Sequence, residues 1–320
     1  QNGLSGHLDI RRIAADGSGA PTLITPAGAD NLFVHLAADG ETVYFLSDAD
    51  GDTDIYRVNA KDGAEAVNLS QNTEDEELIQ AVLPDGSGVV VRLGPEGNDP
   101  NNTGADGELH VLRFPDGEWV QLTDDLVWNR YQAISADGSW MVYRRPIDDD
   151  EDGQQDPGSG ELWAVQTDGN SPPIRLRSFG EGHLGDTYAI THDNARVLYQ
   201  YSEPGSSIDQ IYAVAIEEPH EVIQLTAPEA GESSYYRMLT GDAKTLVYTS
   251  NDVAGGFGDI EVYTTPTAGG PAALVSDMEN DAVMLPKAVL DAQGLVVMEG
   301  NFDGGDYDLY VGAIDGSSFA

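Results

Sequence analysis

Short apolar strands alternate with turns rich in Asp and Gly along the whole chain. Six times, a turn that contains an aspartate precedes an apolar run such as Val43-Tyr44-Phe45 or Val89-Val90-Val91. Successive turn aspartates are 46, 52, 56, 49 and 49 residues apart, and they are Asp39, Asp85, Asp137, Asp193, Asp242 and Asp291. A near-constant interval of this length predicts a repeat architecture with one structural unit per interval.

Each interval continues in a similar way after its apolar run. A loop rich in Asp, Gly and Asn leads into a strand of alternating character, such as Asp54–Val58. A tight turn such as Asp62-Gly63 follows, and then an outer strand such as Val67–Ser70. The alternation indicates strands with two unlike faces, and Asp-Gly suits a hairpin turn. Four hairpin-linked strands per interval predict the blade of a β-propeller.

The first full repeat resembles a known family. Phe45–Val58, followed by Asp62-Gly63 and Asn68-Leu69-Ser70, is similar to the propeller repeat of TolB and the tricorn protease. The resemblance extends over essentially the whole chain, although the third and fourth repeats have long or degenerate loops. The globular domain that precedes the propeller in TolB has no counterpart. The resemblance implies an all-β fold, with residues 1–320 forming a single TolB-like propeller domain.

The strand count bears on how the propeller closes. There are six inner, six second and six outer strands, but seven candidates for the third position. The last repeat has its first three strands, so we expect Pro21–Thr25 to supply the fourth. This would close a six-bladed propeller of four-stranded antiparallel blades and remove its free edges. His7–Ile13 is the surplus candidate, which leaves seven blades as the alternative.

Charge narrows the classes of partner. Asp and Glu number 56 against 15 Lys and Arg, for a net charge of −41. Such a surface repels nucleic acid and anionic membranes and favours metal cations, basic partners or solubility in salt. The few lysines (Lys61, Lys244 and Lys287) and many acids are typical of halophilic or marine proteins. No apolar run approaches the ~18 residues of a membrane span, so no membrane insertion is expected.

Localisation is inferred from weaker features. The chain has no cysteine, which excludes disulfides and thiolate chemistry. It opens on Gln1, as a processed, exported protein or a trimmed chain would. We therefore expect a periplasmic or extracellular protein, and a monomer.

Two acidic segments are candidate calcium sites. In a propeller, the loops from second to third strands emerge on one face, which here is intensely acidic. Carboxylates at relative positions 1, 3, 5 and 9, with Gly153 at 6, match the start of an EF-hand-like loop at Asp148, Asp150, Asp152 and Asp156. Ser159 occupies position 12, where that loop has a bidentate Glu, and the neighbouring Gly158-Ser159-Gly160 favours a plain acidic loop.

The second candidate has carboxylates at every second position, namely Asp48, Asp50, Asp52 and Asp54. Several hard oxygens on one turn suit Ca²⁺. The alternative is a structural turn whose aspartates accept backbone N–H bonds.

Inner strands line the channel of a propeller, and polar side chains on them could hold a small anionic ligand. The residues four or five before each turn aspartate are His35, Gln80, Gln132, Tyr188, Arg237 and Lys287. Alternatively, these side chains only fill the propeller axis.

Motifs for catalysis are lacking. The sequence has no Gly-x-Ser-x-Gly elbow, and its six histidines form no His-Glu-x-x-His pair. We therefore expect a non-catalytic, exported binding or scaffolding module that engages a protein, peptide or glycan through its acidic loop face, with Ca²⁺ ordering loops. The alternative is a channel-based, calcium-dependent hydrolase or lyase acting on a small sugar or lactone.

Overall fold

The computed structural model describes residues 7–37, 39–61, 65–71, 75–95, 107–125, 127, 129–145, 160–180, 183–226, 232–252, 260–276, 283–301 and 307–319. Its contacts divide the chain into two compact units. The first unit comprises residues 1–131, 137–139 and 165–173, and the second comprises 132–136, 140–164 and 174–320.

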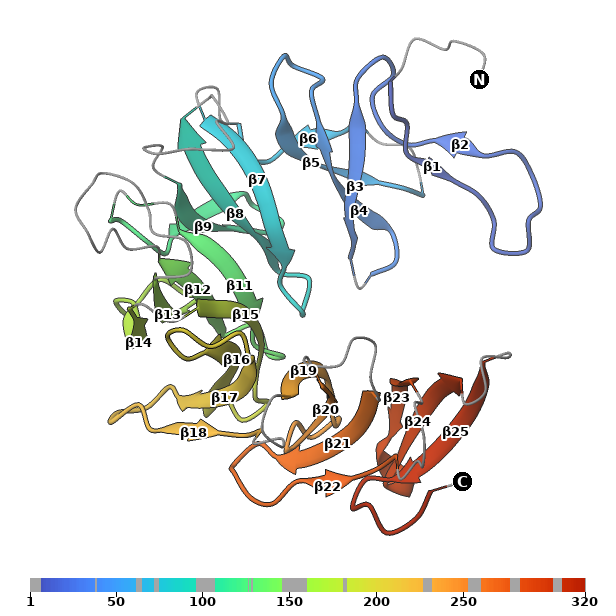
Figure 1. Ribbon diagram of the computed structural model, residues 1–320. Helices are drawn as coiled ribbons and strands as arrows, with labels where there is room; N and C mark the ends of the chain where they lie inside the picture. The colour runs from blue at the N-terminus through green and yellow to red at the C-terminus, as the bar shows by residue number, and fades with distance from the viewer. Residues whose placement is uncertain are drawn as a thin grey trace. The chain divides into compact units, whose positions relative to one another are not determined.

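The first unit contains a two-stranded pair and two four-stranded antiparallel sheets (Figure 1). The pair is β1 (Arg11–Arg12) with β2 (Thr22–Leu23). The first sheet is β3 (Asn31–Leu36), β4 (Thr42–Ser47), β5 (Asp54–Asn59) and β6 (Val67–Asn68). The second sheet is β7 (Asp75–Val82), β8 (Gly88–Pro95), β9 (Glu108–Arg113) and β10 (Glu118–Gln121).

The second unit contains most of the third sheet and all of the later ones. The third sheet is β11 (Arg130–Ile134), β12 (Trp140–Arg145), β13 (Gly160–Gln166) and β14 (Ile174–Phe179). The fourth is β15 (His183–Ile190), β16 (Arg196–Ser202), β17 (Gln210–Ala215) and β18 (Val222–Gln224).

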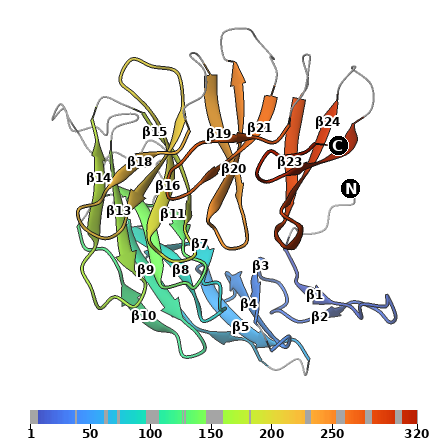
Figure 2. The same ribbon diagram turned by 90° about the horizontal axis from the view of Figure 1, so that it is seen from below.

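The last two sheets lie side by side in Figure 2. A single parallel pair, Ile260 with Val283, joins them. The fifth sheet is β19 (Glu232–Leu239), β20 (Thr245–Asp252), β21 (Ile260–Pro266) and β22 (Ala273–Leu274), and the sixth is β23 (Val283–Leu290), β24 (Leu295–Asn301) and β25 (Asp308–Ala313).

The expected all-β fold of repeated four-stranded antiparallel sheets is confirmed. Within the described ranges, the one helical element is a short 3₁₀ turn at Asp291–Gln293. At the N-terminus, Thr22–Leu23 pairs with Arg11–Arg12. The surplus third-strand candidate and the expected closing strand are thus partners of each other, and the number of blades stays a prediction.

Aspartates shape the turns between inner and second strands. In five of these turns the Asp Oδ1 accepts the backbone N–H two residues later, at 2.8–3.0 Å; they are Asp39, Asp85, Asp137, Asp193 and Asp242. The next residue has a positive φ, which explains the Asp-Gly dipeptide at three of the turns. The sixth turn differs, because Asp291 begins the 3₁₀ turn and accepts a bond from Gly241 N instead.

A hydroxyl group fastens the outer strand to the third strand. In the first sheet, Ser70 Oγ accepts a bond from Ile55 N (2.8 Å) and donates one to Asp54 Oδ1 (2.7 Å). We call the bond from the third-strand N–H to an outer-strand hydroxyl the outer-strand latch. It recurs at Leu109 with Thr123 (2.9 Å), Ile211 with Thr226 (2.9 Å) and Val262 with Ser276 (2.7 Å). In three of the four sheets the hydroxyl also donates to the polar residue just before the latched N–H, which is Asp54, Glu108 or Gln210.

Apolar residues of successive sheets pack against each other inside each unit. In the first unit, Ile55 and Val89 share one cluster, and the rings of Tyr44 and Phe114 stack at 3.6 Å. In the second unit, Val142 and Tyr199 share another cluster. These faces bury the alternating apolar positions that the sequence pattern singled out.

Candidate functional site

Three carboxylates converge where β4 turns into β5. One carboxylate oxygen from each of Asp50, Asp52 and Asp54 lies within 4.8 Å of the other two. Asp54 is buried, Asp52 is half-buried and Asp50 is exposed, so the group runs from the sheet to solvent. The Asp at every second position places these residues on one side of the turn. We call Asp50, Asp52 and Asp54 the carboxylate cluster.

Hydrogen bonds from the third and outer strands hold the cluster. Asn68 Nδ2 on β6 donates to Asp50 Oδ2 (2.8 Å) and to Asp54 Oδ2 (2.7 Å). A hydrogen bond from the Tyr56 hydroxyl lowers the pKa of Asp50. Burial and the same bond raise the pKa of Tyr56, so this phenol stays protonated as a donor. These bonds favour the ionised form of Asp50 and hold Asp50 and Asp54 in a defined geometry.

The cluster fits a hard divalent cation with one adjustment. Three carboxylate oxygens within 4.8 Å of each other are the ligands that Ca²⁺ prefers. The Asn68 amide now turns its nitrogen toward Asp50 and Asp54, and its Oδ1 accepts a bond from Gln71 N (3.0 Å). Rotating this amide by a half-turn would exchange oxygen for nitrogen at the cluster. Asn68 therefore either caps the carboxylates or joins them as a ligand.

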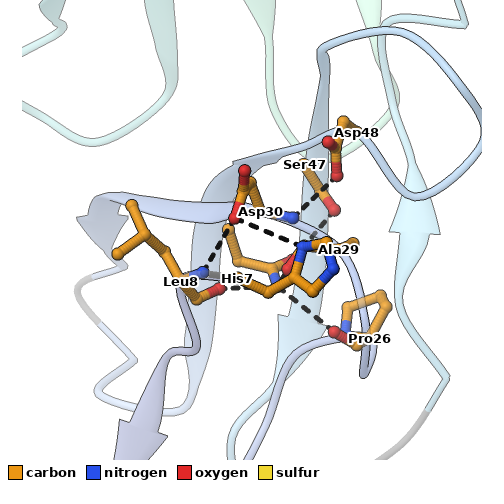
Figure 3. Close-up of polar contacts among 8 residues, drawn as sticks. His7, Leu8, Pro26, Ala29, Asp30, Ser47 and Asp48 are labelled. Atoms are coloured by element: carbon orange, nitrogen blue, oxygen red, sulfur yellow. Dashed lines mark hydrogen bonds and ion pairs between the residues drawn. The ribbon is translucent and has the colours of Figure 1, made fainter. Parts of the chain in front are cut away.

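Asp48, the fourth aspartate of the predicted set, serves a structural bond instead. Its Oδ1 accepts the backbone N–H of Asp30 at 2.7 Å (Figure 3). Asp30 in turn accepts the N–H of Leu8, and the buried Asn31 donates to the carbonyl of Leu8 at 3.1 Å. Asp48 thus anchors the N-terminal segment to the first sheet, while the other three aspartates of the predicted set converge.

The other calcium candidate lies outside the described residues. This applies to Asp148, Asp150, Asp152 and Asp156, so the expectation of an EF-hand-like loop there stays a prediction.

Four of the six predicted channel residues fall at register irregularities of the inner strands. The pairing of inner with second strand skips one residue at Gln80, Arg237 and Lys287, which marks a β-bulge. Tyr188 is likewise skipped in β15, between Thr187 and Ala189, and its side chain is outside the description. In the first sheet the skipped residue is Val34, one before the predicted His35.

Most of these side chains have local partners. Arg237 Nε donates to Thr249 Oγ1 (2.9 Å), and Lys287 Nζ forms an ion pair with Glu299 (2.5 Å). His35 stacks against Tyr44 at 6.4 Å. Gln132 lies half-buried on β11. Arg237 and Lys287 remain exposed cations on the inner strands of consecutive sheets of the second unit.

Two arrangements were not predicted from the sequence. A cavity of about 250 Å³ in the first unit is lined by Arg113, Asp85, Asp137 and Asp168 among others. Its aspartates already serve turns, and Arg113 donates to Thr167 O (2.8 Å). In the second unit, the Arg177 guanidinium lies over four aromatic rings, those of Phe179, Tyr199, Tyr201 and Tyr212, at 5.1–5.7 Å. In both arrangements the residues come from different strands, so no local sequence motif indicates them.

Solved structures of known proteins share this fold. An oligogalacturonate lyase from Vibrio parahaemolyticus matches 97% of this chain and 83% of its own, with TM-score 0.55 and 15% identity. An oligogalacturonate lyase in complex with manganese matches 98% of this chain and 83% of its own, with TM-score 0.54 and 15% identity. TolB from Acinetobacter baumannii matches 87% of this chain and 62% of its own, with TM-score 0.41 and 15% identity.

These structural similarities show the fold and not an activity, because the sequence identity is only 15%. The propeller fold that the repeat predicted is confirmed. No family model matches the sequence. No curated protein matches it either. The described part of the chain has no helix of the length and apolar character needed to cross a membrane.

Proposed function

We propose that the protein is a non-catalytic, exported binding module whose acidic loop face engages a protein, peptide or glycan, with a divalent cation at the carboxylate cluster. The convergence of Asp50, Asp52 and Asp54 carries the proposal. Their mutual repulsion is relieved when a cation binds, and the cation then orders the loop between β4 and β5. The net charge of −41 favours partners with basic groups.

Calcium is the cation we propose, because every donor is an oxygen and the half-exposed loop tolerates a flexible shell. Manganese or magnesium would use the same carboxylates with fewer, stricter ligand positions. Titrating the metal-free protein with Ca²⁺ and with Mg²⁺ in a calorimeter, at fixed ionic strength, separates these alternatives. We expect saturable heat with Ca²⁺ and a higher melting temperature in Ca²⁺ than in chelator.

A matched pair of variants tests the location. Asp52→Asn removes one ligand and should weaken Ca²⁺ binding at least about tenfold. Asp16→Asn removes the same charge from a turn elsewhere, where Asp16 accepts the N–H of Ser18 and lies outside the cluster. An equal loss of Ca²⁺ affinity in both variants would mean that the cation is attracted by the overall negative charge and not by a specific site. Absence of heat and of a melting shift in the unaltered protein would reject the cation.

The inner-strand bulges favour a second candidate function. Arg237 and Lys287 are exposed cations at bulges of consecutive inner strands in an otherwise acidic chain. Such a pair suits a carboxylate-bearing sugar or a lactone, the substrate class of a channel hydrolase or lyase. Incubation with oligogalacturonate, monitored for the ultraviolet absorbance of an unsaturated product, tests it. Loss of product in Arg237→Gln, but not in Arg12→Gln, would support a lyase.

A further inference from the structure

A row of polar side chains crosses the fifth sheet near the start of β19. Ser234 on β19 pairs with Ser250 on β20, and Ser250 pairs with Glu261 on β21. Directly opposite residues of antiparallel strands share a face and lie ~5 Å apart at Cβ. Glu232 comes two residues before Ser234, so its side chain is on the same face. Two carboxylates and two hydroxyls therefore lie together on one face of this sheet.

This face of the fifth sheet packs against the fourth sheet, which lies in the same compact unit. Tyr248, on the same face of β20 as Ser250, shares an apolar cluster with Ile211 of β17. At the polar end of this contact, Ser234 N donates to Asp209 O at 2.8 Å. The polar row thus lies where the fourth sheet meets the fifth, inside the second unit.

The two glutamates of the row bond to hydroxyl groups. Ser250 Oγ donates to Glu232 Oε2 (2.8 Å), and the Tyr263 hydroxyl donates to Glu261 Oε2. Burial, the bond to Glu261 and the charges of both glutamates raise the pKa of Tyr263, so both carboxylates act on one phenol. Among the described residues, neither glutamate forms an ion pair with a basic side chain. Two half-buried negative charges therefore repel each other with no protein cation between them.

Ser234 is the member of the row whose hydroxyl is unpaired. Its side chain is 0% exposed, and its Oγ has no hydrogen-bond partner. The first sheet has the same row as Asn31, Ser47 and Asp54, and there Ser47 Oγ donates to Asn31 Oδ1 at 2.8 Å. In the fifth sheet Ser250 bonds to Glu232 instead, which leaves Ser234 Oγ without that bond. Buried hydroxyls are rarely left unpaired, so this oxygen indicates a ligand beside the two carboxylates.

We propose that Glu232, Glu261 and Ser234 bind a Ca²⁺ ion between the fourth and fifth sheets. The two charges of the ion match the two carboxylates, and Ser234 Oγ supplies a neutral oxygen ligand. Ca²⁺ takes about six to eight oxygens, and water reaches the half-buried carboxylates to complete the shell. The ion holds β19 to β21 and stabilises the second unit. This site is independent of the carboxylate cluster, which lies in the first unit.

Terbium luminescence tests the site, because Tb³⁺ replaces Ca²⁺ at oxygen ligands and is excited through a nearby tyrosine, here Tyr263. In calcium-free protein that carries Asp52→Asn, to weaken the carboxylate cluster, we expect saturable tyrosine-sensitised emission that Ca²⁺ reverses. Adding Glu261→Gln should weaken Tb³⁺ binding at least about tenfold, since a charged ligand is lost. Glu203→Gln makes the same change beside Tyr201 and should leave the affinity unchanged.

Three results of this titration would overturn the proposal. An equal loss in the Glu261 and Glu203 variants would mean an adventitious ion only, attracted by the overall negative charge. Emission that Glu261→Gln leaves unchanged would place the ion elsewhere. Emission abolished by Asp52→Asn alone would assign all of the binding to the carboxylate cluster. Conversely, failure of Ca²⁺ to bind at that cluster leaves this site standing.

Ser234→Ala distinguishes a ligand from a hydroxyl that is merely buried, and it keeps the test valid if Glu261→Gln misfolds. In chelator this variant should melt at the same or a higher temperature than its Asp52→Asn parent, because an unpaired buried group is removed. In Ca²⁺ its melting temperature should rise less than that of the parent, and its Tb³⁺ affinity should be at least about threefold weaker. Equal rises in Ca²⁺ and equal Tb³⁺ affinities would reject the proposal.

Discussion

The guanidinium of Arg177 lies over the ring of Tyr201, with its central carbon 5.1 Å from the ring centroid. It also donates a hydrogen bond to the Tyr199 hydroxyl. Arg177 comes from β14 and the two tyrosines from β16, so this cation joins the third and fourth sheets. Arginine suits the position because its planar group stacks on rings while its edge donates.

Removing this contact should destabilise the second unit. We expect Arg177→Ala to lower the free energy of unfolding by about 2–4 kcal/mol, from lost cation–π contacts and an unpaired hydroxyl. Arg177→Lys should recover only part of this, because an ammonium cannot stack. Urea denaturation measures both. Full recovery of stability in Arg177→Lys would show that side-chain bulk and charge matter and the planar guanidinium does not.

Two glycines of the first unit allow the cost of a positive φ to be measured apart from the cost of a steric clash. Gly40 and Gly117 have φ of 68° and 75°, but a Cβ on Gly117 would lie 2.6 Å from Leu69 O, and one on Gly40 would meet nothing within 4 Å. Gly40→Ala should cost about 1 kcal/mol from the positive φ alone. Gly117→Ala should cost at least about 1 kcal/mol more, since the carbonyl belongs to the neighbouring sheet. Thermal melts of the two variants test the difference.

Alkaline pH should destabilise the second unit through its buried tyrosines. Burial, with the nearby Glu232 charge, raises the pKa of Tyr248 to about 12. An exposed tyrosine in the unfolded chain has a pKa near 10. Because the folded value is raised, the stabilisation is complete below about pH 10 and is lost as the pH rises toward 12.

Tyr248→Phe tests this linkage. The variant should lose less stability than the unaltered protein between pH 9.5 and pH 11.5, by about 1–2 kcal/mol. Urea midpoints at the two pH values give the comparison. A parallel loss in both proteins would place the alkaline sensitivity at other tyrosines.

Asn68 should decide how strongly the carboxylate cluster depends on a cation. Asn68→Asp removes the amide that bonds Asp50 and Asp54 and adds a fourth carboxylate. In chelator we expect a loss of about 2 kcal/mol or more, and in Ca²⁺ a larger rise in melting temperature than the unaltered protein shows. Asn170→Asp makes the same change beside the exposed Asp168. It should alter neither the stability in chelator nor the rise in melting temperature that Ca²⁺ causes. A smaller calcium effect in Asn68→Asp would contradict the site.

Sequence reasoning succeeded where structure repeats. The turn aspartates recur with the strands because each serves the same backbone N–H, so spacing alone predicted the sheets. The latch hydroxyls were visible too, in Asn68-Leu69-Ser70 and Leu225-Thr226, although their role emerged only from the bonds to Ile55 N and Ile211 N. Pattern and spacing therefore predicted the elements and most of their order.

Sequence reasoning fell short where partners come from distant strands. Asp48 looked equivalent to Asp50, yet the turn directs it to Asp30 N, 18 residues earlier. Asn68, which holds the cluster, lies 14 residues beyond Asp54 on another strand. Counting back from the turn aspartate selects His35, whereas the bulge of that strand falls at Val34. Register irregularities and cross-strand bonds leave no periodic signal in the chain.

The turn aspartates also influence the pH at which the protein is least soluble. Hydrogen bonds from the chain's own backbone and side chains lower the pKa of Asp39, Asp85, Asp193 and Asp242, so these groups give up their charge only in stronger acid than usual. Composition alone gives an isoelectric point near 4.1. The folded chain should therefore be isoelectric, and precipitate most readily, at a lower pH than its unfolded form, so moderate acid would aggregate unfolded molecules while folded ones still repel each other.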